Sequence, residues 1–186
     1  AHDTPEILRS DIANVLLEAK LWGSDITSLP LIDQPTSAQV DQAHTLLKLL
    51  DAVDENGKLT DCGKALSQFG TDIRFAHMLF KAQRLSEKHP TIVITAAYLL
   101  ALLESRVQHD ADLMQALSAQ AYKAHPAFKT LLQFWCKRLH CNANDKPDTE
   151  LIPLLLALAY PDRLAKRRGK GFSMANGAGI DARDDV

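Results

Sequence analysis

Five basic side chains gather in the C-terminal part of the chain, at Arg163, Lys166, Arg167, Arg168 and Lys170. Lysine and arginine neutralise phosphates and release their counterions, so a cluster of this kind could hold the backbone of a nucleic acid. The same run is also typical of a solvated connector between folded parts. Of the basic residues in the sequence, this run is the best candidate for contact with a polyanion.

A second group of residues could bind a metal or carry out catalysis. Cys136 and His140 are four residues apart on an expected helix, with Cys141 beside them, and these ligands could hold zinc. A half-buried thiol and a surface histidine explain the same spacing, and we predict no metal site. His77 lies in an apolar helix next to Met78, which favours a packed, hydrogen-bonded histidine over a catalytic one.

The sequence contains none of the common catalytic motifs. There is no GxxxxGK[ST] phosphate loop, no GxGxxG after a strand, no GxSxG elbow and no HExxH. We therefore predict no catalytic residue and no cofactor held by this chain, and a stand-alone hydrolase finds no support.

Other basic and aromatic side chains have both a functional and a structural interpretation. Six further cations could line a groove, although each is more often plain surface: Lys81, Arg84, Arg106, Lys129, Lys137 and Arg138. Trp22, Phe134 and Trp135 could stack on bases, but we expect them in the core.

The overall composition is that of an ordinary globular protein. The chain has 186 residues, 46% hydrophobic and 24% charged, with a formal net charge of −2, so nucleic-acid binding would need a local basic patch. The longest apolar run, Thr91 to Leu103, is too short to span a membrane. No signal peptide is expected, and three cysteines without a C-x-x-C pair favour reduced thiols in a cytoplasmic monomer.

One short stretch predicts a β-hairpin among helices. Asn56-Gly57 lies between Val53 and Leu59, and Asn-Gly between apolar residues is the strongest local signal for a hairpin with a type I′ turn. Helical patterns precede and follow it. Helices with one tight two-stranded wing indicate a winged-helix module, which usually docks on nucleic acid or on a partner domain.

The remaining elements are helical until the C-terminal region. Capping residues and apolar spacing near 3.6 predict helices from Ser10 to Gly23, from Thr36 to Leu50, from Thr60 to Gly70 and from Asp72 to Phe80. After the break at His89-Pro90, we expect helices over 91–104, 111–123, 126–141 and 148–158, as in a bundle. Residues 171–180 predict a second hairpin with an Asn-Gly turn. The expected fold is mainly α, with a winged-helix domain at 1–88, a helical bundle at 89–160, and a basic linker with a partial β domain at 161–186.

The order of these motifs resembles one helicase family. Three pairs of stretches carry the resemblance: PEILRSDI and LWG at 5–12 and 21–23, DENGKLTDCG and GTDIRFAHML at 54–63 and 70–79, and PDRLAKRRG and ANGAG at 161–169 and 175–179. The first two pairs are similar to the winged helix, its wing and the first ratchet helix of DEAH-box/RHA-type helicases. The third resembles a bacterial branch of the same family, where it leads into an OB-like domain.

The resemblance implies one part of an ATP-dependent RNA helicase, the segment C-terminal to its RecA-like domains. In that family the RecA-like domains bind ATP and magnesium, and the ratchet helices help them enclose single-stranded RNA. The winged helix connects the motion of these domains to the ratchet. The expected partners are therefore RecA-like domains in the same protein and single-stranded RNA, with no membrane partner and no activity of the isolated fragment.

The resemblance also suggests which basic residues act. We expect RNA contacts at Arg106, Arg163, Lys166, Arg167 and Arg168, and domain–domain contacts at Arg9 and Arg74. The alternative is a protein-interaction or regulatory winged-helix module that binds no nucleic acid. Four carboxylates crowd the wing, at Asp51, Asp54, Glu55 and Asp61. Their repulsion from phosphate argues against DNA reading by this surface, which we expect to face protein.

Overall fold

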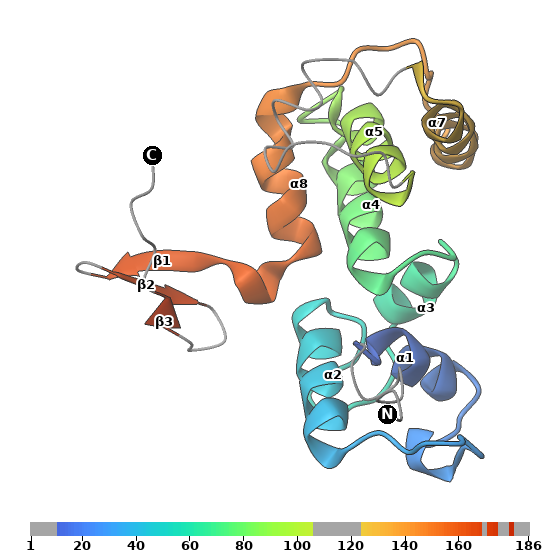
Figure 1. Ribbon diagram of the computed structural model, residues 1–186, viewed down its shortest axis with the longest axis vertical. Coiled ribbons are helices and arrows are strands. Elements are labelled where there is room, and N and C mark those ends of the chain that lie inside the picture. Colours follow the sequence, from blue (N-terminus) through green and yellow to red (C-terminus); the bar gives the residue numbers. More distant parts are fainter. Residues whose placement is uncertain (1–10, 106–123, 169–170, 175–178, 181–186) are drawn as a thin grey trace, which may run out of the picture. The chain divides into compact units, whose positions relative to one another are not determined.

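The computed structural model is mainly helical, as predicted (Figure 1). It describes residues 11–105, 124–168, 171–174 and 179–180. Seven α-helices and one three-stranded sheet lie in this part of the chain. The expected helix at 111–123, together with Arg9 and Arg106, lies outside the described residues. No helix among those described is long and apolar enough to cross a membrane.

Packing divides the chain into two compact units. The first unit consists of residues 1–76 and 160–186, and the second unit consists of residues 77–159. The boundary falls within helix α4 (Ile73–Leu85). The first unit is therefore built from two segments that lie far apart in the sequence.

Three helices form the core of the first unit, α1 (Ala13–Leu21), α2 (Ser37–Leu49) and α3 (Asp61–Ser67). Helix α1 packs against both α2 and α3. Helix α2 begins at a complete capping box, in which Thr36 and Gln39 satisfy each other's backbone N–H groups. These helices and the segment after α2 supply many of the buried apolar side chains of the unit: Leu16, Leu17, Leu46, Leu47, Leu50, Val53 and Leu66.

The expected wing is much smaller than a hairpin of paired strands. Among the described residues, Val53 and Leu59 form one isolated antiparallel bridge, and the loop between them has no assigned strand on either side. The predicted type I′ turn is wrong, because it needs two successive positive φ angles and only Gly57 has one, at 74°. The Asp54 carboxylate accepts hydrogen bonds from the N–H groups of Asn56 and Lys58 instead, and this tightens the loop.

Helix α3 approaches the residues before this loop very closely. Thr60 caps the helix by accepting a hydrogen bond from the N–H of Gly63, and its hydroxyl donates to the carbonyl of Asp51 at 2.6 Å. A Cβ atom on Gly63 would lie 2.2 Å from the carbonyl oxygen of Ala52. Glycine at this position lets the first turn of α3 lie directly against the backbone of the preceding segment.

The second unit is organised around one buried helix, α5 (Ile92–Glu104). It packs against α7 (Pro126–Leu139) and α8 (Ile152–Ala159), and its residues from Ile94 to Leu102 are all buried. A helix that is apolar all round belongs in a core. The buried Trp135 finds a polar partner within this unit, since its indole N–H donates to the Glu104 carboxylate at 2.8 Å.

His77 occupies a structural position in the second unit, as predicted. Its ring is buried, and Nδ1 lies 2.7 Å from the carbonyl oxygen of Leu158, so Nδ1 carries the proton and donates. The expected helix from Asp148 begins instead with a 3₁₀ turn, η4 (Thr149–Leu151), and the α-helix starts at Ile152. Pro153 lacks the N–H that an earlier α-helical turn would need.

The C-terminal residues form an antiparallel sheet in the order β1-β2-β3. Its strands are β1 (Ala165–Arg168), β2 (Gly171–Met174) and β3 (Gly179–Ile180). Strands β2 and β3 are the second hairpin that the sequence predicts, although its Asn-Gly turn lies outside the described residues. Most of the basic run, which the sequence suggested as a linker, is strand β1.

Candidate nucleic-acid interface

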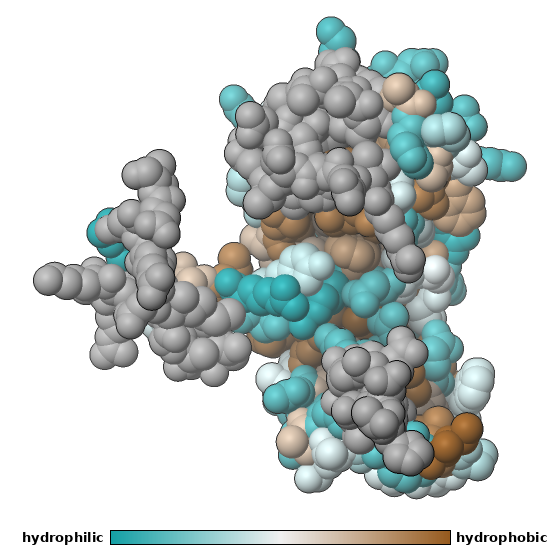
Figure 2. Space-filling model, in the orientation of Figure 1, coloured by the Kyte–Doolittle hydropathy of each residue, from teal (hydrophilic) through white to brown (hydrophobic). Residues whose placement is uncertain are grey.

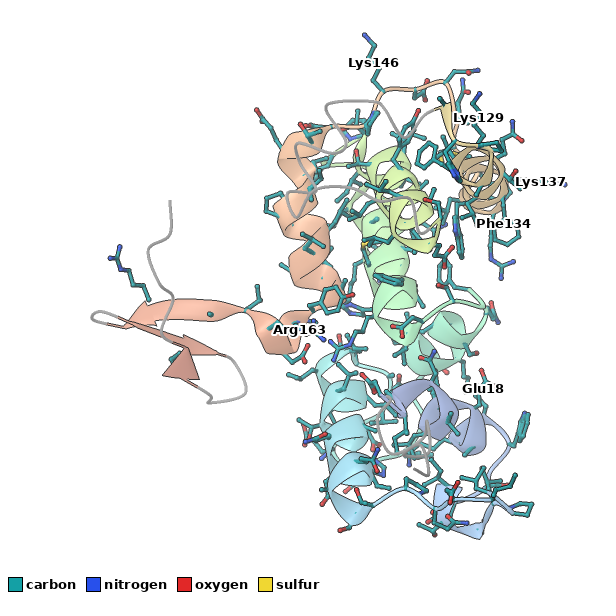
Figure 3. The ribbon with its side chains drawn as sticks, in the orientation of Figure 1. Glu18, Lys129, Phe134, Lys137, Lys146 and Arg163 are labelled. Carbon is teal, nitrogen blue, oxygen red and sulfur yellow. The ribbon has the colours of Figure 1, made fainter. Side chains whose placement is uncertain are left out.

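The basic run forms a 3₁₀ turn followed by a strand. Arg163 ends the turn η5 (Pro161–Arg163), the backbone becomes extended at Leu164, and β1 follows (Figure 3). The side chains of Arg163, Lys166 and Arg167 are all exposed. Arg168 also belongs to β1, but its side chain is outside the described part. The structure thus brings four of the five expected RNA-contacting residues into one short segment.

The geometry of β1 distributes these cations over an edge strand. Among the described strands β1 has one neighbour, β2, so its other edge is not paired within this sheet. Lys166 pairs with Ser173 and Arg167 pairs with Phe172 in the antiparallel register. Because successive side chains of a strand point to opposite faces, cations are present on both faces of this strand. Charged edge strands also resist pairing with other chains, which is a purely structural role for the same residues.

Tyr160 holds the beginning of the basic segment. The Arg163 guanidinium carbon lies 4.7 Å from the centre of the Tyr160 ring, within the range of a cation–π contact. The same ring meets Phe75 edge-to-face, with centroids 6.2 Å apart, and lies 5.2 Å from the guanidinium carbon of Arg74. Tyr160 therefore holds the start of the basic segment against the first residues of α4.

Arg74 and Asp162 anchor the same segment through a two-point ion pair. The Arg74 guanidinium donates to both oxygens of the Asp162 carboxylate, at 2.5 and 3.0 Å, and also meets Asp11 at 3.5 Å. Its side chain is only 10% exposed. The hydrogen bond from Arg74 lowers the pKa of Asp162. Burial acts to lower the pKa of Arg74, but the hydrogen bond and charges of Asp162 and Asp11 raise it overall.

This ion pair also determines the charge of the candidate interface. Asp162 is the only acidic residue between Pro161 and Arg168. Its carboxylate is engaged at both oxygens by Arg74, and Arg163 also acts on it electrostatically. Apart from this carboxylate, the charged residues between Pro161 and Arg168 are all basic, in a chain whose formal net charge is −2.

We expect replacement of Arg74 by methionine to destabilise the first unit by about 2–3 kcal/mol, because it leaves a partly buried carboxylate without its partner. Thermal unfolding followed by circular dichroism measures this loss.

A pH series with Asp162→Asn gives the second readout. The pKa of Asp162 is lowered on folding, so its contribution is complete above its ordinary value of 3.8 and is lost as the pH falls through the folded pKa. The difference in stability between wild type and Asp162→Asn should therefore shrink below about pH 4. A constant difference across this range would contradict the anchoring role.

The surface around the wing carries charges of both signs. Its four carboxylates, at Asp51, Asp54, Glu55 and Asp61, are all exposed. Two of them meet lysines, since Glu55 lies 3.5 Å from Lys48 and Asp61 lies 3.0 Å from Lys64. The Lys20 ammonium donates to the carbonyl of Gly57 at 2.8 Å and so is engaged with the backbone of the loop. Carboxylates and lysines are therefore mixed on this surface, and two of the carboxylates are paired with lysines.

Helix α7 presents a second set of cations that the sequence left undecided. Lys129 and Lys137 are exposed on this helix, and so is Phe134, at 52% (Figure 3). The helix contains no acidic residue. The expectation of a buried Phe134 is wrong, as is that for Trp22, which is 74% exposed, while Trp135 is buried as expected. The spacing of Lys129 and Lys137, two turns apart, was the signal that places them on one face.

Comparisons with known proteins connect this arrangement to one family. Residues 43–71, which include the wing and all of α3, match the model of the helicase-associated domain (HA2), winged-helix. The ATP-dependent RNA helicase HrpB of Escherichia coli is 36% identical over 190 aligned residues, which cover 99% of this chain and 22% of that protein. A crystal structure of the Escherichia coli DEAH/RHA helicase HrpB matches with a TM-score of 0.76 and 35% identity, over 100% of this chain and 23% of the other.

A more distant relative matches the same region. The ATP-dependent RNA helicase DHX30 of Gallus gallus is 30% identical over 141 residues, which cover 72% of this chain and 12% of that protein. The chain thus spans about a fifth or less of the length of these relatives. The chain belongs to the DEAH/RHA helicase family and is an HrpB-like region that contains the helicase-associated winged helix.

Proposed function

We propose that this chain is the accessory region of an ATP-dependent RNA helicase that connects the motion of RecA-like domains to single-stranded RNA. The observation that carries the proposal is the concentration of exposed cations at Arg163, Lys166 and Arg167, next to a carboxylate that is already paired. The names of the relatives support RNA as the nucleic acid. In the complete protein, RecA-like domains preceding this region would bind ATP and magnesium.

The proposed contact is with phosphates rather than with bases. Flexible lysine and arginine side chains on both faces of an edge strand suit a backbone whose charges are regularly spaced, and they carry no information about base identity. We expect Arg168, and separately Arg106, to contact RNA phosphates as well. Binding by the isolated chain should be weak, since its net charge is −2 and the RecA-like domains would complete the site.

The wing has a different role in this proposal. Its exposed carboxylates repel phosphate, and two of its lysines are already paired with them, so we assign the wing to a neighbouring protein domain and treat it as a joint. Arg9 is assigned to such domain contacts as well. Arg74 has a structural role within the first unit, where its ion pair with Asp162 anchors the start of the basic segment.

A protein-interaction module without nucleic-acid binding is the second candidate. Exposed apolar side chains favour it, because Trp22 and Ile32 are 74% and 101% exposed near the segment that joins α1 to α2. Figure 2 shows hydrophobic surface over that segment. Contact with another domain of the same protein would explain this patch under either candidate, so RNA binding is the property that separates them.

We expect the double variant Arg167→Ala/Arg168→Ala to bind single-stranded RNA several-fold more weakly than wild type at low salt, and the difference to shrink at moderate salt. Fluorescence anisotropy with a labelled single-stranded RNA measures both effects. Lys58→Ala/Lys64→Ala, which removes the same charge from the wing, is the matched control. Binding that ignores both the salt and the Arg167/Arg168 variant would overturn the phosphate-contact proposal and favour the protein-interaction module.

A further inference from the structure

The C-terminal end of α7 places two cysteines side by side. The helix ends at Leu139, and His140 takes a left-handed conformation with φ 56° and ψ 42°. The N–H groups of His140 and Cys141 both donate to the carbonyl of Cys136, the second at 3.0 Å. A bond from Cys141 back to Cys136 is the six-residue closure of a Schellman-type helix end, which usually brings an apolar pair into contact. Here both members of that pair are cysteines.

The two thiols are in contact but differ in exposure. Cys136 is buried, at 3% exposure, whereas Cys141 is half-buried. Their side chains share a hydrogen bond. The backbone closure holds the two residues together at the C-terminal end of α7. Both cysteines are free thiols in this structure.

The hydrogen bond makes the two thiols unequal. It lowers the pKa of Cys141, whose thiolate accepts, and raises the pKa of Cys136, which donates and is also buried. The negative charge of Asp145 acts against ionisation of both. Cys141 is thus the more accessible and the more acidic thiol, as expected of the one that reacts first with an oxidant.

We propose that Cys136 and Cys141 form a reversible intramolecular disulfide when the protein meets a peroxide. The Cys141 thiolate attacks one peroxide oxygen, which gives a sulfenic acid and, after protonation of the departing hydroxide, water. The Cys136 sulfur then attacks the sulfenic sulfur, which forms the S–S bond, and the Cys136 proton leaves with the hydroxyl as a second water. Two thiols lose two electrons in total, and one hydrogen peroxide gains them.

The remaining cysteine provides an internal control. Cys62 lies in α3, and its thiol donates to the carbonyl of Leu50 at 3.8 Å.

No third His, Cys, Asp or Glu side chain joins Cys136 and Cys141 to form a metal-binding group among the described residues. Oxidation of the pair is therefore a property of these two thiols and not of a metal cluster.

The test treats the full chain with equimolar hydrogen peroxide, blocks the remaining thiols with N-ethylmaleimide and maps the peptides by mass spectrometry. We expect a disulfide that links the Cys136 and Cys141 peptides, a blocked Cys62, and full reversal by dithiothreitol. Before oxidation, Cys141 should react with N-ethylmaleimide about tenfold faster than Cys136. Disulfide-linked dimers, or oxidation of Cys62 before the pair, would overturn the proposal.

Serine variants of the three cysteines separate the roles of the thiols. Cys136→Ser should leave Cys141 to form a sulfenic acid that a dimedone reagent traps, because no second sulfur is available. Cys141→Ser should make the remaining thiol of the pair resistant to the same peroxide treatment, while Cys62→Ser should form the disulfide at the wild-type rate. A Cys62→Ser variant that fails to form it would contradict the assignment.

Discussion

Gly63→Ala should destabilise the first unit by about 3 kcal/mol or more, the largest effect on stability that we expect from one added methyl group. The new Cβ would lie 2.2 Å from the carbonyl oxygen of Ala52 and 2.8 Å from Cδ1 of Leu59. The Leu59 side chain can move, but the Ala52 carbonyl is backbone and accepts hydrogen bonds from both the N–H and the hydroxyl of Thr60. The first turn of α3 would therefore have to move away from the Ala52 backbone.

Urea unfolding followed by circular dichroism measures this effect. Lys64→Ala is the matched control, since it lies next in the same helix turn with an exposed side chain and should change stability by about 0.5 kcal/mol or less. If Gly63→Ala is as stable as Lys64→Ala, α3 does not lie against the Ala52 backbone as described.

Charge reversal in β1 should produce the largest effect on RNA binding. We expect Lys166→Glu/Arg167→Glu to weaken binding of single-stranded RNA about a hundredfold at low salt, because two phosphate contacts are lost and two repulsions replace them. Both side chains are exposed, so the fold should tolerate the change. Fluorescence anisotropy against wild type measures the affinity, and circular dichroism checks the fold.

Lys58→Glu/Lys64→Glu on the wing changes the net charge by the same amount. A general electrostatic effect would weaken RNA binding equally in both variants, whereas a local contact at β1 would affect mainly the first. Equal losses would therefore contradict the assignment of the contact to β1.

Local chemistry explains why most helices could be predicted from the sequence. Thr36 with Gln39 and Thr60 with Gly63 are capping pairs that act within three residues, and they fix the starts of α2 and α3. Gly23 and Gly70 take the positive φ angles expected after the ends of helices. These interactions are contained in short stretches, so the pattern of residue types is sufficient.

The wing and the aromatic side chains depend on more than local pattern. Asn-Gly favours a type I′ turn, but the Asp54 carboxylate binds two backbone N–H groups of the loop and selects another closure. Phe134 has helical spacing consistent with either face, and neighbouring Trp135 takes the buried position. The spacing alone did not indicate which of the two would face the core.

The RNA contacts expected in the basic run stay a prediction, but the strand that carries most of that run was not foreseen. The basic run was visible from composition, whereas its extended pairing with β2 depends on a register set between two segments. The anchor between Arg74 and Asp162 joins residues 88 positions apart, which no local pattern reports. That long-range pair engages the one carboxylate that the sequence places between Pro161 and Arg168.

Photocrosslinking tests the central claim most directly. A single-stranded RNA containing 4-thiouridine is irradiated with the chain, which is then digested at the N-terminal side of aspartate and mapped by mass spectrometry. We predict that crosslinks concentrate in the peptide from residue 162 to residue 180, which contains the basic turn and β1. Crosslinks confined to the wing peptides at 54–60 and 61–71, with none at 162–180, would contradict RNA contact through the basic segment.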